Sequence, residues 1–158
     1  MKLASCFISF LVIMSFVGCS EKLPDGMPKL VKVSLTFTQD GKPLTEATVA
    51  LHPEGSSSQW TVGGVTDNHG VVVLKTHGNY TGVPEGKYKI CVQKFVREGE
   101  LQTMANPGAP PPKDYNLVES QYAHKNDTPL SVEIIPGSKY PPFDLGKAVK
   151  ELLKAPGM

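Results

Sequence analysis

From residue 30 onward, apolar and polar side chains alternate in short runs that are separated by turn residues. In residues 30–38 the alternate positions Val31, Val33, Leu35 and Phe37 are apolar, and the positions between them are polar. This spacing is typical of a β-strand that buries one face. The chain also has 15 Gly and 14 Pro, above the average share of about 12% for the two together. The pattern predicts a mainly β domain of short strands joined by turns, as in a β-sandwich.

Further runs of the same kind continue the pattern toward the C-terminus. We predict strands at residues 47–52, 60–66, 71–76, 86–97 and 130–135, with an edge strand at 143–145. Within the strand at 86–97, Tyr88, Ile90 and Val92 share the buried side, and Cys91 faces away from them. All these strands belong to one domain, residues 30–158, which is long enough for one core.

Two stretches of this domain depart from the strand pattern. Residues 98–129 include Pro107 and three consecutive prolines at 110–112, so we expect an irregular insert that is either functional or partly ordered. Near the C-terminus, Leu145, Ala148, Val149 and Leu152 recur at helical spacing. This spacing predicts a short C-terminal helix at residues 147–154.

The first eighteen residues have the composition of a secretory signal. Lys2 supplies a positive start, residues 3–17 are mostly apolar, and small residues precede Cys19. A transmembrane helix is a rival interpretation, but it needs about 20 apolar residues, and this run is shorter and interrupted by serines. A signal in which Cys19 is incidental is a second alternative. We expect residues 1–18 to be removed and residues 19–29 to form a polar tether.

The end of this segment, Phe16-Val17-Gly18-Cys19, resembles the lipobox of bacterial lipoproteins. The resemblance implies that Cys19 becomes the new N-terminus and carries fatty acids such as palmitate, which would hold the protein on a membrane. It implies a place in the cell envelope, and Ser20 after the cysteine favours the outer membrane. Since Cys6 leaves with the signal and Cys19 carries lipid, Cys91 is left without a partner for a disulfide.

Three motifs stand in a fixed order along the domain. They are Asp40-Gly41-Lys42-Pro43-Leu44, Thr66-Asp67-Asn68-His69-Gly70 and Gly86-Lys87-Tyr88-Lys89-Ile90. Together they resemble the carboxypeptidase regulatory-like domains, and in particular small bacterial lipoproteins built from one such domain. The resemblance covers residues 30–135 and implies the seven-stranded transthyretin-like, or prealbumin-like, β-sandwich. Because this fold supports many functions, the resemblance does not imply an activity.

The sequence offers little for catalysis. The four histidines of the domain, His52, His69, His77 and His124, lack the spacing of a metal site, and there is no nucleophile-elbow or phosphate-loop motif. Two enzyme families share related sandwiches, the hydroxyisourate hydrolases and the intradiol dioxygenases. The chain does not carry the tail motif of the first or the His-x-His element of the second. We therefore expect no catalysis, metal or cofactor, and a net charge of +1 does not favour nucleic acid.

Aromatic side chains are the candidates for recognition. Trp60, Tyr80, Tyr115 and Tyr122 could contact a protein or glycan partner, although Trp60 and Tyr122 also fit the rim of the core. The prolines at 110–112 with Tyr115 fit either a docking strip or a rigid spacer.

The function expected from the sequence is a non-catalytic binding or assembly module, anchored in the cell envelope, whose partner the sequence does not identify. One alternative is an accessory domain or cryptic enzyme of a hydrolase system, which would bring histidines and acids together. A purely structural envelope role is the other, and it predicts neither a pocket nor exposed aromatic clusters.

Overall fold

The computed structural model describes residues 23–55, 60–99, 108 and 110–153. Within them the chain is mainly β, with fifteen strand segments, one short 3-10 turn and no α-helix. The strands are β1 (Leu30–Val31), β2 (Ser34–Gln39), β3 (Lys42–Pro43), β4 (Thr48–Pro53), β5 (Val62–Val65), β6 (Val71–Val73), β7 (Lys75–Thr76), β8 (Tyr80–Thr81), β9 (Val83–Pro84), β10 (Gly86–Gln93), β11 (Phe95–Glu98), β12 (Lys113–Asn116), β13 (Ser131–Ile134), β14 (Phe143–Asp144) and β15 (Glu151–Leu152). The 3-10 turn, η1, spans Ser120–Ala123.

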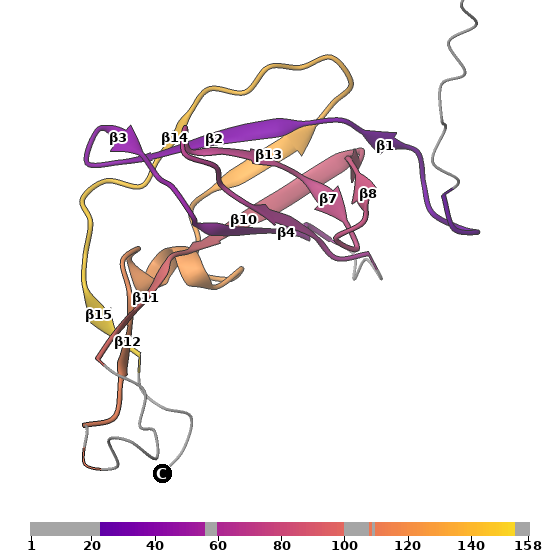
Figure 1. The fold of residues 1–158 in the computed structure, drawn as a ribbon. Helices are drawn as coiled ribbons and strands as arrows, with labels where there is room; N and C mark the ends of the chain where they lie inside the picture. The colour runs from indigo at the N-terminus through magenta and orange to yellow at the C-terminus, as the bar shows by residue number, and fades with distance from the viewer. Residues whose placement is uncertain (1–22, 56–59, 100–107, 109, 154–158) are drawn as a thin grey trace, which may run out of the picture.

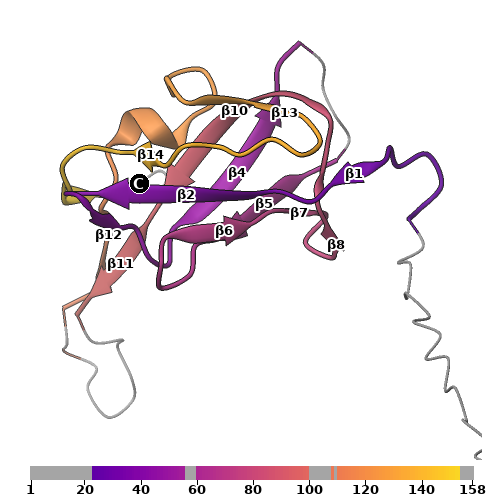
Figure 2. The same ribbon diagram turned by 90° about the horizontal axis from the view of Figure 1, so that it is seen from above.

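Two sheets face each other across the core, as the prediction of a β-sandwich requires (Figures 1 and 2). The larger sheet has the strand order β13-β10-β4-β5-β7-β8, and the smaller one has the order β14-β2-β3, with β6 also paired to β2. The predicted edge strand at 143–145 is confirmed as β14, which pairs in parallel with β2. The strands are divided into many short segments, where seven continuous strands were expected.

One stretch of chain connects the two sheets. β6 pairs with β2 in the smaller sheet, whereas β7, two residues further on, pairs with β5 in the larger one. Leu74 lies at the crossing, fully buried, and its N–H donates to the carbonyl of Val33 at 3.3 Å. The same short segment therefore holds both layers.

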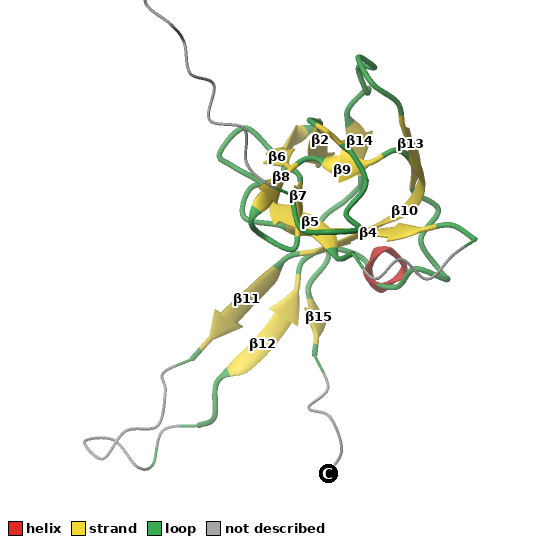
Figure 3. Cartoon of the chain, turned by 90° about the vertical axis from the view of Figure 1, so that its right-hand side faces the viewer, coloured by secondary structure: helices red, strands yellow, loops and turns green. Residues whose placement is uncertain are grey.

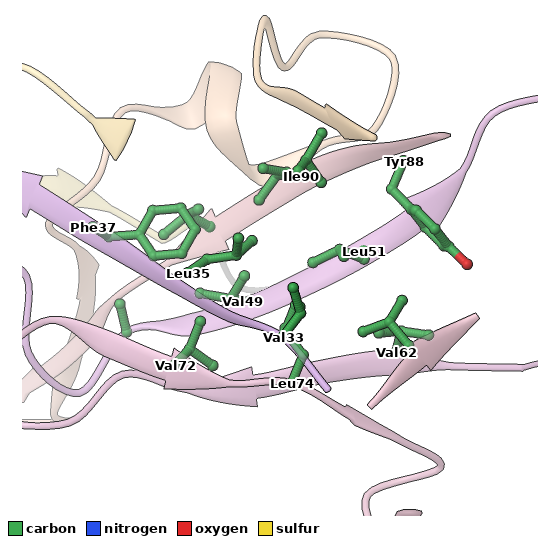
Figure 4. Packing of buried hydrophobic residues seen from close by; sticks show 14 of the residues in the cluster. Val33, Leu35, Phe37, Val49, Leu51, Val62, Val72, Leu74, Tyr88 and Ile90 are labelled. Atoms are coloured by element: carbon green, nitrogen blue, oxygen red, sulfur yellow. The ribbon is translucent and has the colours of Figure 1, made fainter. Parts of the chain in front are cut away.

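The core includes the apolar residues that alternation predicted on the main strands (Figure 4). Leu35 and Phe37 on β2, Val49 on β4 and Ile90 on β10 are all essentially inaccessible to solvent. Phe37 stacks on Phe143 of β14 with ring centroids 5.4 Å apart. Each large side chain buried in this way stabilises the fold by about 1.5–3 kcal/mol.

The predicted C-terminal helix at 147–154 is wrong for residues 147–153, which contain no helical turn and include β15. The N–H of Val149 donates to the Leu117 carbonyl at 3.2 Å, and that of Leu153 donates to the Asp114 carbonyl at 2.9 Å, so this segment bonds to the chain around β12. A helix of eight residues is marginal in water unless one face is buried. Here Leu145 is buried but Ala148 and Leu152 are exposed, so the helical spacing does not mark a buried face.

The second half of the predicted irregular insert at 98–129 contains regular structure, which corrects the expectation for this part of the chain. This part of the chain contains β12 and η1, and β12 pairs with β11 and with β15. The predicted strand at 86–97 breaks at Lys94 into β10 and β11. Residues 100–107 and 109 of the insert lie outside the described residues.

β11, β12 and β15 form a three-stranded sheet, here called the ribbon, that projects from the sandwich (Figure 3). In Figures 1 and 2 the ribbon leaves the sandwich at the end opposite β1. A sheet that extends from the body in this way exposes both of its faces and its edges to possible partners.

A tight turn between β5 and β6 supports the smaller sheet. Asp67 Oδ1 accepts the N–H groups of His69 at 2.8 Å and Val71 at 2.9 Å, and these bonds lower the pKa of Asp67. Gly70 has φ +72°, and its carbonyl accepts the N–H of Phe37 at 2.8 Å. The turn thus fixes the position of β2 beside β6.

We predict that Gly70→Ala destabilises the protein more than Gly41→Ala does. Both glycines have φ near +70°, so an alanine costs about 1–2 kcal/mol at either position. At Gly70 the added Cβ would also lie 2.4 Å from the Phe37 carbonyl oxygen, whereas at Gly41 it meets nothing within 4 Å. Urea unfolding should therefore show a further loss of about 1–3 kcal/mol for Gly70→Ala. Equal losses in the two variants would show that the close approach to β2 is not present.

Candidate functional site

An open groove of about 960 Å³ lies between the ribbon and η1. Its walls combine apolar side chains, among them Phe95 and Leu153, with polar ones such as Asp114 and His124. A smaller hollow lined by Phe95, Arg97, Asp114 and Leu153 adjoins it. The two hollows share three residues, so they form one continuous concave surface along the ribbon.

Large apolar side chains are exposed on this surface. The exposed fractions are 51% for Phe95 and 42% for Leu153, and Leu152 beside it on β15 is 55% exposed. Side chains of this size are ordinarily buried in the core or used in interfaces. Their concentration on one small sheet makes the groove the candidate functional site.

Asn116 fixes the base of the ribbon where it leaves the sandwich. Its side chain is buried, with 4% exposed, and Oδ1 accepts N–H groups from Lys94 at 3.1 Å and Val118 at 3.2 Å. Lys94 is the break between β10 and β11. The amide therefore satisfies a backbone donor that the interrupted sheet would leave unpaired, and unpaired buried donors are costly.

An ion pair crosses the ribbon on the groove side. Arg97 of β11 lies opposite Asp114 of β12 and binds it through two bonds, Nε to Oδ1 at 2.6 Å and Nη2 to Oδ2 at 2.8 Å. The hydrogen bonding with Arg97 lowers the pKa of Asp114, and the same bonding raises the pKa of Arg97. The pair holds two strands in register between the exposed Phe95 and Leu153.

A second charged contact lies on the other face of the ribbon. Lys150 Nζ is 2.6 Å from Glu98 Oε1 and 4.5 Å from the centre of the Tyr115 ring. The hydrogen bond to Glu98 is the largest cause of the raised pKa of Lys150. This contact ties the segment before β15 to β11 across β12, so both faces of the ribbon are braced.

The four aromatic residues proposed from the sequence do not form one site. Tyr115 is in the ribbon but lies under Lys150, and it is not a groove residue. Tyr122, on η1, packs against the core, which agrees with a place at its rim. Trp60 is half-buried and meets His77 edge-on at 5.0 Å, and Tyr80, also half-buried, is on β8. The roles of all four in binding stay predictions.

The groove residues were not predicted as site residues. Phe95 was expected near the end of a strand, Asp114 in an irregular insert and Leu153 in a helix. The local pattern carries little signal for these strands, because neither Phe95-Val96-Arg97-Glu98 nor Lys113–Asn116 alternates apolar and polar residues.

The histidines and cysteines among the described residues are not grouped into a further site. Among the described residues, no three of His, Cys, Asp and Glu are grouped so as to hold a metal ion. Cys91 is a buried free thiol whose pKa is raised by burial, and Cys19 lies outside the described residues. No helix of the described residues is long and apolar enough to cross a membrane.

Comparison of the chain with protein-family models, with curated proteins and with solved structures gives no match.

We predict that Arg97→Gln raises the pKa of Asp114 toward the ordinary value for an aspartate. The guanidinium hydrogen bonds favour the charged carboxylate. The pair therefore stabilises the ribbon at pH values above the ordinary aspartate pKa. This stabilisation is lost as the pH falls through the lowered pKa of Asp114. A carboxyl-carbon NMR titration measures the shift. Lys150→Gln, which removes a cation from the other face, is the matched control and should leave the Asp114 titration unchanged. An unchanged pKa in Arg97→Gln would contradict the pairing.

Proposed function

We propose that this protein is a lipid-anchored module of the cell envelope that binds a protein partner, without catalysis, through the groove beside the ribbon. The observation that carries the proposal is the exposed apolar surface formed by Phe95 and Leu153 along the groove. The purely structural alternative predicted neither a pocket nor exposed aromatic clusters, so the presence of the groove favours a binding role.

The chemistry of the groove favours a protein over a glycan. Glycan sites present flat aromatic faces with polar groups around them, whereas this surface combines one phenylalanine with leucines and a proline, Pro112. Apolar anchors surrounded by polar groups are the pattern of protein interfaces. Asp114, Asn116 and His124 supply the polar groups here.

The position of the groove fits an anchored protein. The ribbon lies at the end of the sandwich opposite β1, the first strand of the chain (Figures 1 and 2). If Cys19 carries lipid, a short tether joins the membrane to the β1 end, and the groove is then presented on the far side of the domain. The sandwich would act as a spacer and support.

We further propose that the sandwich is of the transthyretin-like type found in carboxypeptidase regulatory-like domains. The turn at Asp67–Gly70 supports this relation, because its Asp bonds backbone groups and its Gly has positive φ. Tyr88 of the third motif also fits, with its ring in the core and its hydroxyl donating to the Pro84 carbonyl at 2.9 Å.

We predict that Phe95→Ser abolishes capture of a partner from solubilised envelope membranes. The variant removes an aromatic anchor that is already 51% exposed, so the core is untouched. Val73→Ser is the matched control, because Val73 is 54% exposed on β6, away from the groove. A partner retained by the parent and by Val73→Ser, but not by Phe95→Ser, would support the proposal. Equal capture by all three, or none by the parent, would refute it.

A separate experiment tests the anchor. We predict that Cys19→Ser prevents labelling with a fatty acid and releases the protein into the soluble fraction, because the Cys19 thiol is the group to which the lipid would be attached. Cys91→Ser, which alters a buried thiol, should leave labelling and membrane retention intact. Retention of Cys19→Ser on membranes with full labelling would defeat the lipoprotein assignment.

A further inference from the structure

The outer edge of β11 is open. Among the described residues, β11 pairs with β12 on one side, and β4, the neighbour of β10 on the other side, ends its pairing at Gln93. In Figure 3, β11 is one of the two edge strands of the ribbon, with β12 between it and β15. An open strand edge presents unpaired N–H and C=O groups to which another strand can add.

Two hydrogen bonds establish which backbone groups of β11 point outward. The Leu117 N–H donates to the Lys94 carbonyl at 2.8 Å, and the Asp114 carbonyl accepts the N–H of Leu153 on β15. Since hydrogen-bonded and non-bonded pairs alternate in an antiparallel ladder, Val96 bonds to β12, whereas Phe95 and Arg97 direct their backbone groups away from it. The open edge therefore offers two N–H and two C=O groups.

This pattern restricts how a second β11 could pair with the first. Two residues that lie opposite each other in an antiparallel pair are either both hydrogen-bonded across it or both not. A β11 residue whose backbone N–H and C=O point to the open edge must therefore lie opposite another such residue. A register centred on Phe95 would bring Arg97 opposite Gln93, which is already paired with Thr48 of β4. A register centred on Arg97 would place two guanidinium groups opposite each other, which is repulsive. The register centred on Val96 has neither defect.

We propose that two copies of this chain associate through their β11 edges, antiparallel and centred on Val96, to join the two ribbons into one six-stranded sheet. Phe95 of each copy then lies opposite Arg97 of the other, which allows four backbone hydrogen bonds and two cation–π contacts. Lys94 lies opposite Glu98 of the other copy.

The charges of the edge are complementary in this register. Lys94 Nζ contacts the Thr45 hydroxyl at 3.3 Å, and among the described residues no carboxylate is within ion-pair distance of it. Glu98 is half-exposed and binds Lys150, so it can also receive a second cation. The association does not depend on the partner-binding role of the groove.

Cysteine cross-linking tests the register directly. In the full chain with Cys6 and Cys19 replaced by serine, Val96→Cys places two thiols at a non-bonded pair with Cα atoms about 4.5 Å apart, which a disulfide can span. Arg97→Cys, the matched control, leaves its two Cα atoms about 8 Å apart. Under mild oxidation in detergent, the Val96 variant should form covalent dimer several-fold faster than the Arg97 variant and the parent. Equal rates, or faster linking through position 97, would overturn the proposal.

Charge reversal tests the same contact without a new thiol. Glu98→Lys should weaken dimerisation about tenfold by sedimentation velocity, because both Lys94–Glu98 pairs become repulsive. The double variant Lys94→Glu/Glu98→Lys should restore it, although it does not restore the Glu98–Lys150 bond. A parent that stays monomeric at high concentration, as expected if the edge receives a strand of another protein, would overturn the proposal, as would failure of the double variant to recover.

Discussion

The packing of two sheets against each other is the interaction on which the rest of the molecule depends. Leu35 and Phe37 from the smaller sheet meet Val49 and Ile90 from the larger one, and all four are buried. The one cysteine among the described residues, Cys91, is a free thiol, so no disulfide reinforces this part of the chain. The segment through Leu74, which pairs with both sheets, adds a backbone connection between the layers. The ribbon can project only because this packing holds its base.

Strand β10 links the core to the ribbon. Ile90 and Val92 are fully buried, and two residues later the chain leaves the sandwich at Lys94, where Asn116 accepts the interrupted backbone N–H. The same chain then continues as β11, whose Phe95 is half-exposed. A change in the core would therefore be transmitted to the groove through one continuous backbone, whereas a change at Phe95 leaves the core unaltered.

Alternation in the sequence predicted the main sandwich strands, because strands such as β2, β4 and β13 bury alternate residues. Val33, Leu35, Val49 and Ile90 were placed correctly for this reason. The ribbon was not predicted, because neither of its faces is buried and its strands are brought together from distant parts of the chain. Glu151 pairs with Asn116 across 35 positions, and no local spacing reports such a pairing. The exposed Leu152 also completed a helical pattern by chance, which led to the wrong helix.

The claim on which both proposals most depend is that β11 is a formed strand with one open edge. Residue-resolved amide hydrogen exchange by NMR, at a protein concentration low enough to keep the chain monomeric, tests it most directly. We expect slow exchange at Val96 and Glu98, whose N–H groups face β12, and fast exchange at Phe95 and Arg97, whose N–H groups face solvent. Uniformly fast exchange at all four would contradict the ribbon, and uniformly slow exchange would contradict its open edge.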